Sequence, residues 1–595
     1  MPPPPHLHLP GPCSSICEPQ LFYPSTRAKA FIDGRTGTTI TRGQLKHLCL
    51  SLAYGLKEHP TTSVFAKRGD TVLIFSPNSL AWPVLLHGSL AAGLRCTLAN
   101  SAYTPPELAH QYTDSGAKLI LAAQELVPVV LEMLTKQLGL SSAEAGKRIV
   151  VVPDDLSWAG GPASPRPDHL NLVDLLGLGT LEKEESFDGV ADKETALLCY
   201  SSGTTGKPKV RLEKILFFRL CSEPPRRASK PPTRTLLHSW TSRTGSFPPL
   251  RPEQTLLAIL PFYHIYGITN VLNGALSVGA TAVIQTRFEP VEFCRNIERY
   301  TVGYVLLVPP VLVVLARHPA VDQYDLSSLE YLLSGAAPLG ADLMRMVQKR
   351  LLSKRKKGSK CLITQGYGLT ETSPSTHTLD FKVCEQHVGS IGQLLATLEA
   401  RLVADDEGDE VVDAEVGKRG ELWIRGKTVM KGYLNNPTAT NNSITPDKWF
   451  KTGDIAIRDK DGYYFIVDRK KELIKYKGFQ VPPAELEAIL LTHPDIADAA
   501  VIGVNSVSEA TELPRAYVVH ANPTKVNTPA KTAAFSKSVQ KWMESKVAKH
   551  KFLRGGVAVV DAIPKSAAGK ILRKELREVA KQEAERGELG VKAKL

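Results

Sequence analysis

Short apolar runs alternate with segments of helical apolar spacing along the first half of the chain. Thr71–Phe75 is a short run rich in β-formers, and Trp82–Ala92 has the apolar spacing of a helix. Similar apolar runs recur at Ala117–Ala122, Arg148–Val152, Thr255–Leu260, Ala280–Gln285 and Tyr304–Val308. Strands buried on both faces of a parallel sheet give such continuous runs. The pattern predicts an α/β fold of parallel or mixed sheets flanked by helices.

The pattern changes in the last quarter of the chain. A hairpin-like run, Tyr463–Val467, leads into a polar junction, Asp468–Glu472, and then into a small α+β unit that ends in a solvated helix from Leu572. We therefore predict a domain boundary near Asp468, with a large N-terminal domain at 1–467 and a small C-terminal domain at 468–595.

Composition is that of an ordinary globular protein. The 595 residues are too many for one hydrophobic core, and 43% hydrophobic with 22% charged residues exclude a fibre or a disordered chain. The net charge of +13 suits anionic ligands, but basic and acidic residues alternate along the chain, so we predict no nucleic-acid partner. The nine cysteines contain no CxxC pair and favour reduced thiols.

Targeting signals are sparse. The start, Met1–Pro5, lacks the basic and apolar regions of a secretory signal. The apolar run Val302–Ala316 is interrupted by Pro309 and Pro310 and is too short to cross a bilayer, so we expect no transmembrane span.

The stretch Tyr200–Lys209 combines glycines, hydroxyls and two cations. Glycines let backbone N–H groups turn toward an anion, Ser and Thr hydroxyls add donors, and Lys207 and Lys209 supply charge. A Walker A loop is excluded because Pro208 follows Lys207, where that motif needs Ser or Thr opening a helix. The stretch predicts a loop that holds the phosphates of a nucleotide.

Further motifs follow it in order: Gln365–Thr372, Gly420–Gly426, Lys451–Asp454, Asp468–Gln480 and Pro564–Lys570. The ordered set resembles the adenylate-forming superfamily, which holds acyl-CoA and aryl-CoA synthetases, firefly luciferase and the adenylation domains of peptide synthetases. The resemblance runs from about Phe31 to about Leu576 and is closest to the branch of 4-coumarate:CoA ligases and luciferases, whose Tyr-Lys-Gly-Phe-Gln-Val stands here at Tyr476–Val481. It implies an acid–thiol ligase with a small mobile C-terminal domain that uses ATP, Mg²⁺ and CoA.

The resemblance also implies a nucleotide site. Tyr367 supplies an aromatic face for adenine, Asp454 matches the ribose ligand with Arg469 beside it, and Glu371 matches the Mg²⁺ ligand. The full set at ATP-binding positions is Ser201, Ser202, Gly203, Thr204, Thr205, Gly206, Lys207, Lys209, Gly335, Ala336, Ala337, Gly366, Tyr367, Gly368, Thr370, Asp454 and Arg469.

Catalytic and CoA positions follow from the same resemblance. Lys570 matches the lysine that neutralises the attacking carboxylate and the α-phosphate, two anions that must meet. Lys570 would block the approach of the thiol, so the small domain must move, and Lys471 falls on the family's hinge position. The resemblance places Lys570, His264, Lys475 and Gln480 at catalytic positions and Lys477 and Gly478 on the CoA-contacting turn.

The acyl pocket is predicted from Pro261–Gly267, which resembles the family's motif with a histidine at a strand end. His264 would lie near the carboxylate and Tyr266 along the substrate. The substrate-pocket positions are His264, Tyr266, Asn270, Gly335, Gly366 and Pro374. They do not distinguish an aromatic acid from a fatty acid.

One region departs from the family. After Lys209 a Gly-Val/Met-x-x-(Ser/Thr)-His motif opening a helix is expected, but the chain continues as Val210–Glu213, and 224–252 is crowded with Pro, Arg and Ser. Two explanations stay open for 210–252: genuine divergence, or a gene-model artefact from a retained splice donor.

The last residues, Ala593-Lys594-Leu595, are a close variant of the Ser-Lys-Leu tripeptide read by the peroxisomal import receptor. We predict a peroxisomal protein, with the cytoplasm as the alternative location. Two alternatives to a CoA ligase also stay open: a luciferase-like adenylating enzyme, and a catalytically impaired protein that binds adenylate or acyl-CoA.

Overall fold

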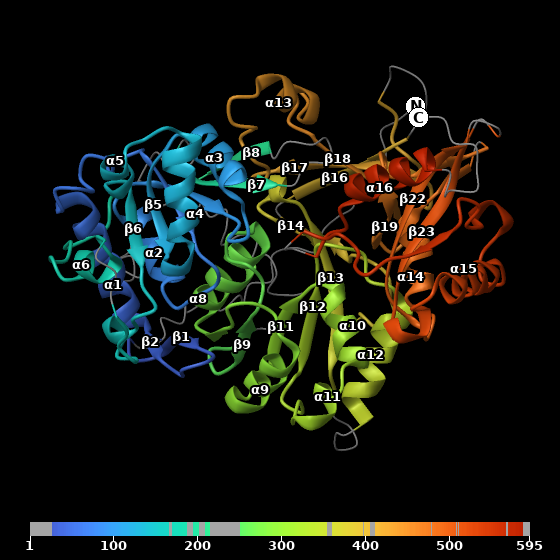
Figure 1. The fold of residues 1–595 in the computed structure, drawn as a ribbon, viewed down its shortest axis with the longest axis horizontal. Helices are drawn as coiled ribbons and strands as arrows, with labels where there is room; N and C mark the ends of the chain where they lie inside the picture. Colours follow the sequence, from blue (N-terminus) through green and yellow to red (C-terminus); the bar gives the residue numbers. More distant parts are fainter. Residues whose placement is uncertain are drawn as a thin grey trace, which may run out of the picture.

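The computed structural model in Figure 1 describes most of the chain. The described residues are 26–165, 169–186, 194–201, 209–214, 250–353, 360–396, 398–404, 411–477, 479–506, 509, 511–566 and 569–586, with the backbone alone at 201 and 209–214. Within them we distinguish a large unit, residues 26–469, and a C-terminal unit, residues 474–586.

A mostly parallel sheet forms one side of the large unit. Its strand order is β6-β5-β3-β4-β7-β8, and every neighbouring pair is parallel except β7 and β8. The strands are β3 (Thr71–Phe75), β4 (Arg95–Ala99), β5 (Ala117–Ala123), β6 (Ile149–Val152), β7 (Thr195–Ser201) and β8 (Lys209–Lys214). Every residue of β3 and β6 is buried, as continuous apolar runs predict.

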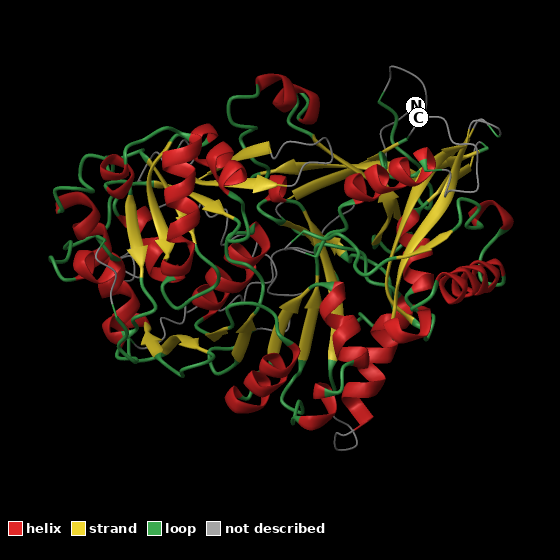
Figure 2. Cartoon of the chain, in the orientation of Figure 1, coloured by secondary structure: helices red, strands yellow, loops and turns green. Residues whose placement is uncertain are grey.

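A second, larger sheet forms the centre of the molecule (Figure 2). Its order is β15-β14-β13-β12-β11-β9-β10-β1-β2, parallel from β13 to β1 and antiparallel at both margins. The strands are β1 (Lys29–Asp33), β2 (Thr39–Thr41), β9 (Thr255–Ala258), β10 (Thr281–Ile284), β11 (Tyr304–Leu307), β12 (Tyr331–Ser334), β13 (Leu362–Gly368), β14 (Ser375–Thr378) and β15 (Gln393–Leu394). The apolar runs near 255, 280 and 304 are therefore its inner strands.

Helices pack between and around these sheets. In α2, which begins after Ala81, every side chain is buried, and α2 packs against α1, which opens with a capping box between Thr41 and Gln44. The helices of the large unit are α1 (Arg42–Glu58), α2 (Trp82–Ala91), α3 (Pro105–Asp114), α4 (Val127–Glu132), α5 (Ser142–Gly146), α6 (Leu172–Leu176), α8 (Gly274–Val278), α9 (Pro290–Tyr300), α10 (Pro309–Arg317), α11 (Ala320–Gln323), α12 (Ala341–Ser353) and α13 (Pro437–Ser443). No helix among the described residues has the length and hydropathy of a membrane span.

An antiparallel sheet, β16-β17-β18-β19, completes the large unit. Its strands are β16 (Leu398–Val403), β17 (Arg419–Gly426), β18 (Phe450–Arg458) and β19 (Tyr464–Arg469). The hairpin-like run at 463–467 is thus the start of β19. This strand continues through Asp468, which pairs with Ile455.

The C-terminal unit has a hydrophobic core of its own, with members from Ile474 to Ala580. Its elements are β20 (Ile474–Tyr476), β21 (Phe479–Val481), α14 (Pro483–Leu490), β22 (Ile496–Ser506), β23 (Thr511–His520), α15 (Pro529–Glu544), β24 (Val557–Val559) and α16 (Arg573–Glu585). The predicted fold class, a large α/β domain followed by a small α+β domain, is confirmed. The boundary at 467/468 stays a prediction, and the cores of the two units divide between Tyr464 and Ile474.

Candidate active site

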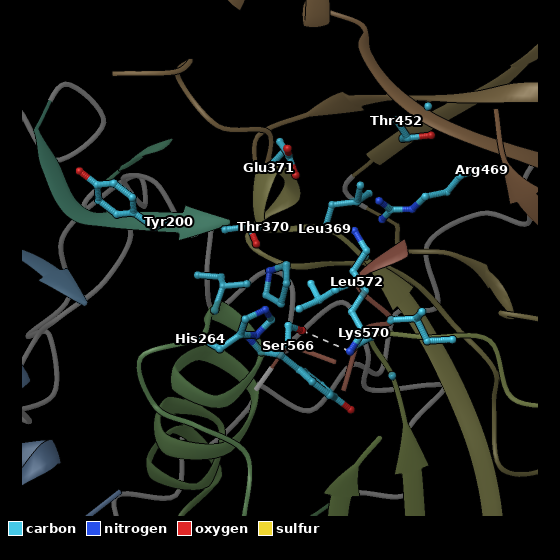
Figure 3. Close-up of a pocket in the computed structure, with 18 of the residues that line it drawn as sticks. Tyr200, His264, Leu369, Thr370, Glu371, Thr452, Arg469, Ser566, Lys570 and Leu572 are labelled. Carbon is cyan, nitrogen blue, oxygen red and sulfur yellow. Dashed lines mark hydrogen bonds between the residues drawn. The ribbon is translucent and has the colours of Figure 1, made fainter. Parts of the chain in front are cut away.

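A cavity of about 1810 Å³ lies where the large unit and the C-terminal unit meet. It borders the carboxyl ends of β12 and β13, the place where open α/β sheets bind ligands. Gly335, Gly366 and Tyr367 of the large unit line it together with Ser566 and Lys570 of the C-terminal unit. Figure 3 shows Ser566 and Lys570 in one view with His264, Glu371 and Arg469. Residues from distant parts of the sequence therefore share one cavity.

Tyr367, Asp454 and Arg469 form a buried cluster at one wall. The Tyr367 hydroxyl donates to Asp454 Oδ2, and Arg469 Nε lies 3.4 Å from Asp454 Oδ1. Asp454 on β18 and Arg469 on β19 face each other in the ladder, which fixes this pairing. Burial raises the pKa of the Asp454 carboxyl, while Arg469, the Tyr367 hydroxyl and the Lys570 ammonium act to lower it. A buried carboxylate held in this way can accept hydrogen bonds from a pair of hydroxyls.

The turn after β12 packs closely against Tyr266. A Cβ on Gly335 would lie 2.9 Å from the Tyr266 ring, so glycine alone fits there. The next residue, Ala336, has a φ of 68°, a left-handed conformation that costs free energy for a side-chain-bearing residue. The same end of the ring is held by β12, because the Tyr266 hydroxyl donates to the Leu333 carbonyl at 3.3 Å. The predicted small-residue wall thus stands beside the predicted acyl-pocket tyrosine.

Glu371 lies in the short turn Thr370–Thr372 and is buried. The Tyr433 hydroxyl donates to Glu371 Oε1 at 3.0 Å, and the Met430 amide donates to the Glu371 carbonyl at 2.8 Å. A carboxylate oriented in this way is a hard oxygen ligand that suits Mg²⁺. The described residues contain no group of three or more His, Cys, Asp or Glu suited to a metal ion, so a magnesium bound at Glu371 would need oxygens from phosphates or water.

Lys570 projects from a tight turn. The Lys570 amide donates to Ser566 Oγ at 3.2 Å, and the Ser566 amide donates to the Lys570 carbonyl at 2.8 Å. Gly569 has a φ of 77°, and a Cβ there would lie 3.2 Å from Val308 of the large unit. Burial lowers the pKa of the Lys570 ammonium to about 8, Arg469 acts in the same direction, and Glu472 and Asp454 oppose them. The turn delivers one cation into the cavity and packs against the large unit.

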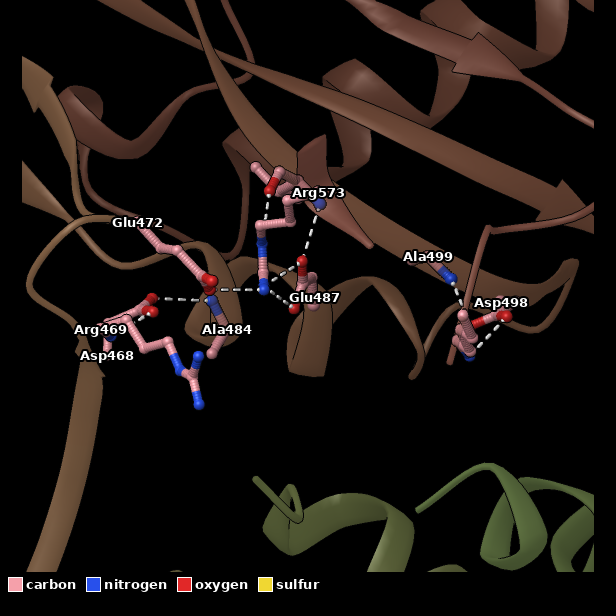
Figure 4. A network of polar contacts seen from close by, with 10 residues as sticks. Asp468, Arg469, Glu472, Ala484, Glu487, Asp498, Ala499 and Arg573 are labelled. Atoms are coloured by element: carbon pink, nitrogen blue, oxygen red, sulfur yellow. Dashed lines mark hydrogen bonds and ion pairs between the residues drawn. The ribbon is translucent and has the colours of Figure 1, made fainter. Parts of the chain in front are cut away.

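A buried ion-pair cluster lies at the start of the helix that follows this turn (Figure 4). Arg573, at the start of α16, donates to Glu472 at 2.7 Å and to both oxygens of Glu487 at 2.7 Å. Asp468 accepts from the Ala484 amide at the start of α14 at 3.1 Å, and burial raises the pKa of its carboxyl to about 7, against the opposing effect of Arg573. The cluster joins the polar junction to the helix that follows Lys570. No motif in the sequence marks this cluster.

The acyl side of the cavity is lined by the Pro261–Gly267 motif and by the π-helical segment Gly267–Asn273. His264 Nδ1 accepts from the Tyr266 amide at 3.2 Å, so the proton of the neutral ring sits on Nε2. Asn270 Nδ2 donates to Ser375 Oγ at 3.1 Å. Pro374 also lines the cavity, so all six predicted substrate-pocket residues lie along it.

Three side-chain polar atoms on this side are buried and make no hydrogen bond within the described residues. They are Asn270 Oδ1, His377 Nε2 and Thr378 Oγ1, on side chains that line the cavity. Asn270 is 3% exposed and Thr378 5%, and burial lowers the pKa of the His377 imidazole to about 3, so that ring is neutral. Buried polar atoms are nearly always paired, so these three are exceptions within the wall of the cavity. His377 and Thr378 belong to no motif that the sequence shows.

The hairpin β20–β21 lies outside the cavity. Lys475 and Gln480, predicted to be catalytic, are exposed there and do not line the cavity. Lys477 forms an ion pair with Glu509 at 2.8 Å instead. Lys471 does line the cavity, in the turn after β19. Among the described residues, the structure brings Tyr367, Glu371, Arg469 and Lys570 together at the cavity and leaves Lys475, Lys477 and Gln480 apart from them.

Part of the predicted site lies outside the described residues. These positions are Ser202, Gly203, Thr204, Thr205, Gly206, Lys207 and Gly478. Ser201 and Lys209 are described by backbone only and pair across β7 and β8. In the anomalous segment 210–252, residues 210–214 belong to β8 where the family pattern predicts a helix start. The terminal tripeptide from Ala593 also lies beyond the described part.

Comparisons with known proteins agree with this geometry. The family model described as AMP-binding enzyme matches residues 23–434, and that of the AMP-binding enzyme C-terminal domain matches 485–570. A 4-coumarate–CoA ligase-like protein of Oryza sativa subsp. japonica is 35% identical over 93% of this chain and 90% of its own. The peroxisomal OPC-8:0-CoA ligase 1 of Arabidopsis thaliana is 34% identical over the same shares.

Solved structures share the fold. ATP-bound MatB from Rhodopseudomonas palustris superposes with a TM-score of 0.74 at 23% identity, covering 94% of this chain and 96% of MatB. The chain belongs to the AMP-binding enzyme family, the adenylate-forming enzymes that include acyl- and aryl-CoA ligases. The predicted superfamily and the prediction that the protein is an enzyme, an AMP-forming acid–thiol ligase, are confirmed.

Proposed function

We propose that this protein is an ATP-dependent acyl- or aryl-CoA ligase that joins a carboxylic acid to AMP with release of pyrophosphate and then transfers the acyl group to CoA. The observation that carries the proposal is the entry of Lys570 into the cavity lined by Tyr367, Glu371 and Arg469. A cation between two anionic reactants, with a nucleotide wall beside it, suits adenylation.

In the first half-reaction, a carboxylate oxygen attacks the α-phosphorus of ATP, and the bond to the pyrophosphate oxygen breaks. Lys570 lowers the repulsion between the carboxylate and the phosphate. Tyr367 stacks on adenine, Asp454 accepts from the ribose hydroxyls, and Arg469 favours the ionised form of Asp454 against the effect of burial. Glu371, held by Tyr433, would bind Mg²⁺, which supplies charge neutralisation for the phosphates.

The phosphate loop completes this half-reaction. We assign the departing β- and γ-phosphates to the glycines, hydroxyls and lysines of Ser201–Lys209, by the resemblance given above. Directly before this stretch, β7 ends at Ser201 at the carboxyl edge of the first sheet, the edge where open α/β sheets bind ligands.

In the second half-reaction, the sulfur of CoA attacks the acyl carbon, the bond to the AMP oxygen breaks, and the thiol proton passes to solvent. Lys570 stands in the cavity in the present structure, so residues 468–595 must turn as a mobile domain before the thiol can approach. We assign the hinge to Lys471, the CoA contacts to Lys477 and Gly478, and the adenylate contacts to Lys475 and Gln480.

The acyl side supports a carboxylic acid with an aromatic ring or an alkyl chain. His264 would orient the carboxylate through Nε2–H, and Tyr266 would lie along the chain or ring.

The ending Ala593-Lys594-Leu595 supports a peroxisomal location through the import receptor, with the cytoplasm as the alternative. The Arabidopsis relative carries the word peroxisomal in its name, which agrees with this proposal. A fusion of the last residues to a fluorescent protein, compared with the same fusion lacking Leu595, tests it directly.

Pyrophosphate release with a panel of acids tests the enzymatic proposal. Cinnamic, phenylacetic, benzoic and medium-chain fatty acids should be compared in pairs, each with and without a distal hydroxyl. We expect release with at least one acid and thioester formation once CoA is added. Release with no acid, from a protein that still binds ATP, would favour the impaired binding protein; release followed by light or no thioester would favour a luciferase-like enzyme. Sequencing the transcript across codons 205–260 separates an artefact from true divergence.

A further inference from the structure

Helix α10 meets the C-terminal unit at both of its ends. At its start, Val308 and Pro310 approach Gly569 so closely that a Cβ there would lie 3.2 Å from Val308 and 3.5 Å from Pro310. At its end, Arg317 reaches the loop that follows α14. Figure 1 shows α10 and α12 on the side of the large unit that faces α14. One helix of the large unit therefore contacts both the Lys570 turn and a second site on the C-terminal unit.

Arg317 makes its contacts with backbone carbonyls across the interface. Its Nη2 donates to the Leu491 carbonyl at 2.8 Å and to the His493 carbonyl at 3.5 Å, and its Nη1 donates to the Ile496 carbonyl. The Arg317 side chain is half-buried at these contacts, and this burial lowers the pKa of the guanidinium from its ordinary value. Arg317 does not line the cavity.

The chemistry of the α14 end explains why an arginine fits there. The last carbonyls of a helix lack partners within the helix and carry the negative end of its dipole. The last turn of α14 contains no basic residue of its own. Arg317 supplies the missing cation from the other unit, with a planar fork that can meet several carbonyls at once.

Helix α10 does not need Arg317 for its own end. Arg350 of α12 donates to the carbonyls of Leu315 at 3.2 Å and His318 at 2.9 Å. The carbonyl end of α10 is therefore capped from within the large unit. This arrangement leaves Arg317 to serve the interface.

A third contact lies between these two ends of the interface. A Cβ on Gly340, just before α12, would lie 3.2 Å from the Cβ of Ala488 on α14. Such a distance is tighter than ordinary van der Waals contact, so the two units fit closely here. The orientation of the C-terminal unit is thus set at Gly569, at Ala488 and at the carbonyls beyond α14.

We propose that Arg317 is a positioning residue that latches the C-terminal unit in the orientation that places Lys570 in the cavity. The proposal rests on the proposed function, because its consequence is a split between the two half-reactions. Loss of the latch shifts the population toward orientations that withdraw Lys570 and let the β20–β21 hairpin approach. Adenylation then slows, while thioester formation from preformed acyl adenylate does not.

Arg317→Ala tests the latch. We expect ATP–pyrophosphate exchange to fall about tenfold, equal to about 1.4 kcal/mol, with thioester formation from isolated acyl adenylate and CoA unchanged or faster. Arg317→Lys keeps the charge but loses the planar fork. Its rate of ATP–pyrophosphate exchange should lie between those of the unchanged protein and Arg317→Ala. Arg345→Ala is the matched control, because Arg345 is an exposed arginine on α12 paired with Asp342 within the same helix.

A second variant reaches the same interface without touching the arginine. Ala488→Leu places a larger side chain against Gly340 and should separate the units at that contact. We expect the same split, with slower exchange and undiminished thioester formation. Equal loss of both half-reactions in Arg317→Ala and Ala488→Leu, or no loss in either, would overturn the latch.

Hydrogen exchange provides a readout that does not depend on turnover. In Arg317→Ala, amides of residues 491–496 and 569–572 should exchange faster, while those of the buried strand β11 stay unchanged. Faster exchange in a protein that turns over no acid would support the latch and count against the proposed function alone. Unchanged exchange at both segments would overturn the latch whatever the activity.

Discussion

Two short segments of the C-terminal unit carry most of its predicted chemistry, and they stand in opposite places. The turn at Ser566–Lys570 lies inside the cavity, packed against Val308 and supported by the buried Arg573 cluster. The hairpin β20–β21 lies outside it, with Lys475 and Gln480 exposed and Lys477 paired to Glu509.

One small domain therefore carries two separate sets of reactive groups, one on the turn and one on the hairpin. The helix that follows the turn begins at Arg573, whose ion pairs are buried and resist local opening. The hairpin is anchored in the core through Ile474, Tyr476 and Val481, and its exposed side chains, such as Lys477, can exchange their partners. A motif in the sequence marks that a segment has a role. It does not say which of the two segments faces the cavity in a given orientation.

The largest expected effect is on stability. Arg573→Ala leaves Glu472 and Glu487 buried without their cation, and breaking a buried pair in this way costs about 3–5 kcal/mol. We expect the C-terminal unit to unfold at lower denaturant concentration, measured by Trp542 fluorescence. Lys581→Ala on the exposed part of the same helix is the control and should change little. An equally stable Arg573→Ala protein would mean that the turn does not depend on this cluster.

Lys570→Ala tests the chemistry of the turn. Removing one preorganised donor from a site of charge development lowers rates by about 10²–10³-fold, and we expect this loss in ATP–pyrophosphate exchange. Conversion of isolated acyl adenylate to thioester should continue at close to its original rate, since Lys570 has left the cavity by then. Comparable losses in both assays would contradict the assignment of the turn to adenylation and of the hairpin to thioester formation.

Lys477→Ala tests the hairpin in the reverse direction. We expect thioester formation to fall about tenfold, mainly through a higher KM for CoA, because a charge-assisted contact to a phosphate contributes roughly 1.5–3 kcal/mol. Pyrophosphate exchange should not change. Stability should fall by no more than about 1 kcal/mol, because the pair with Glu509 is exposed. Slower exchange in this variant would place the hairpin in the adenylation step.

The smallest effect is a difference in pH dependence. The pKa of Lys570 is lowered to about 8, so its charge is present below that pH and is lost as pH rises through it. The pKa of Lys477 is raised by Glu509, so its charge persists in that range. We expect kcat/KM for ATP in pyrophosphate exchange to fall about fourfold between about pH 7 and about pH 8.5, with no fall in thioester formation. Parallel profiles for the two half-reactions would contradict this assignment.

Much of the fold is predictable from the sequence because buried parallel strands leave continuous apolar runs. Thr255–Leu260 was predicted as a strand and is β9 at Thr255–Ala258; Ala117–Ala122 is β5, one residue longer. Very short elements such as β15, at Gln393–Leu394, leave no such trace. Their strand state comes from a neighbour in space, here β14.

The site was predictable only where a motif marks it. Tyr433 bonds Glu371 from a position far along the chain, and Arg573 meets Glu472 and Glu487 across three elements. Arg317 on α10 is one arginine among many until the fold brings it to the end of α14. These contacts depend on the packing of whole units, which no local pattern encodes.

The bond between the Tyr367 hydroxyl and Asp454 has a consequence for how a nucleotide would enter. The Tyr367 hydroxyl already donates to one oxygen of the Asp454 carboxylate. The hydroxyls of an arriving ribose would therefore replace this hydrogen bond rather than bind a buried oxygen that has no partner. This replacement lowers the net free energy gained when the nucleotide binds. In the ligand-free protein, it keeps the Asp454 oxygen hydrogen-bonded. Between turnovers, the Tyr367 hydroxyl thus takes the place of a ribose hydroxyl as the hydrogen-bond donor to Asp454.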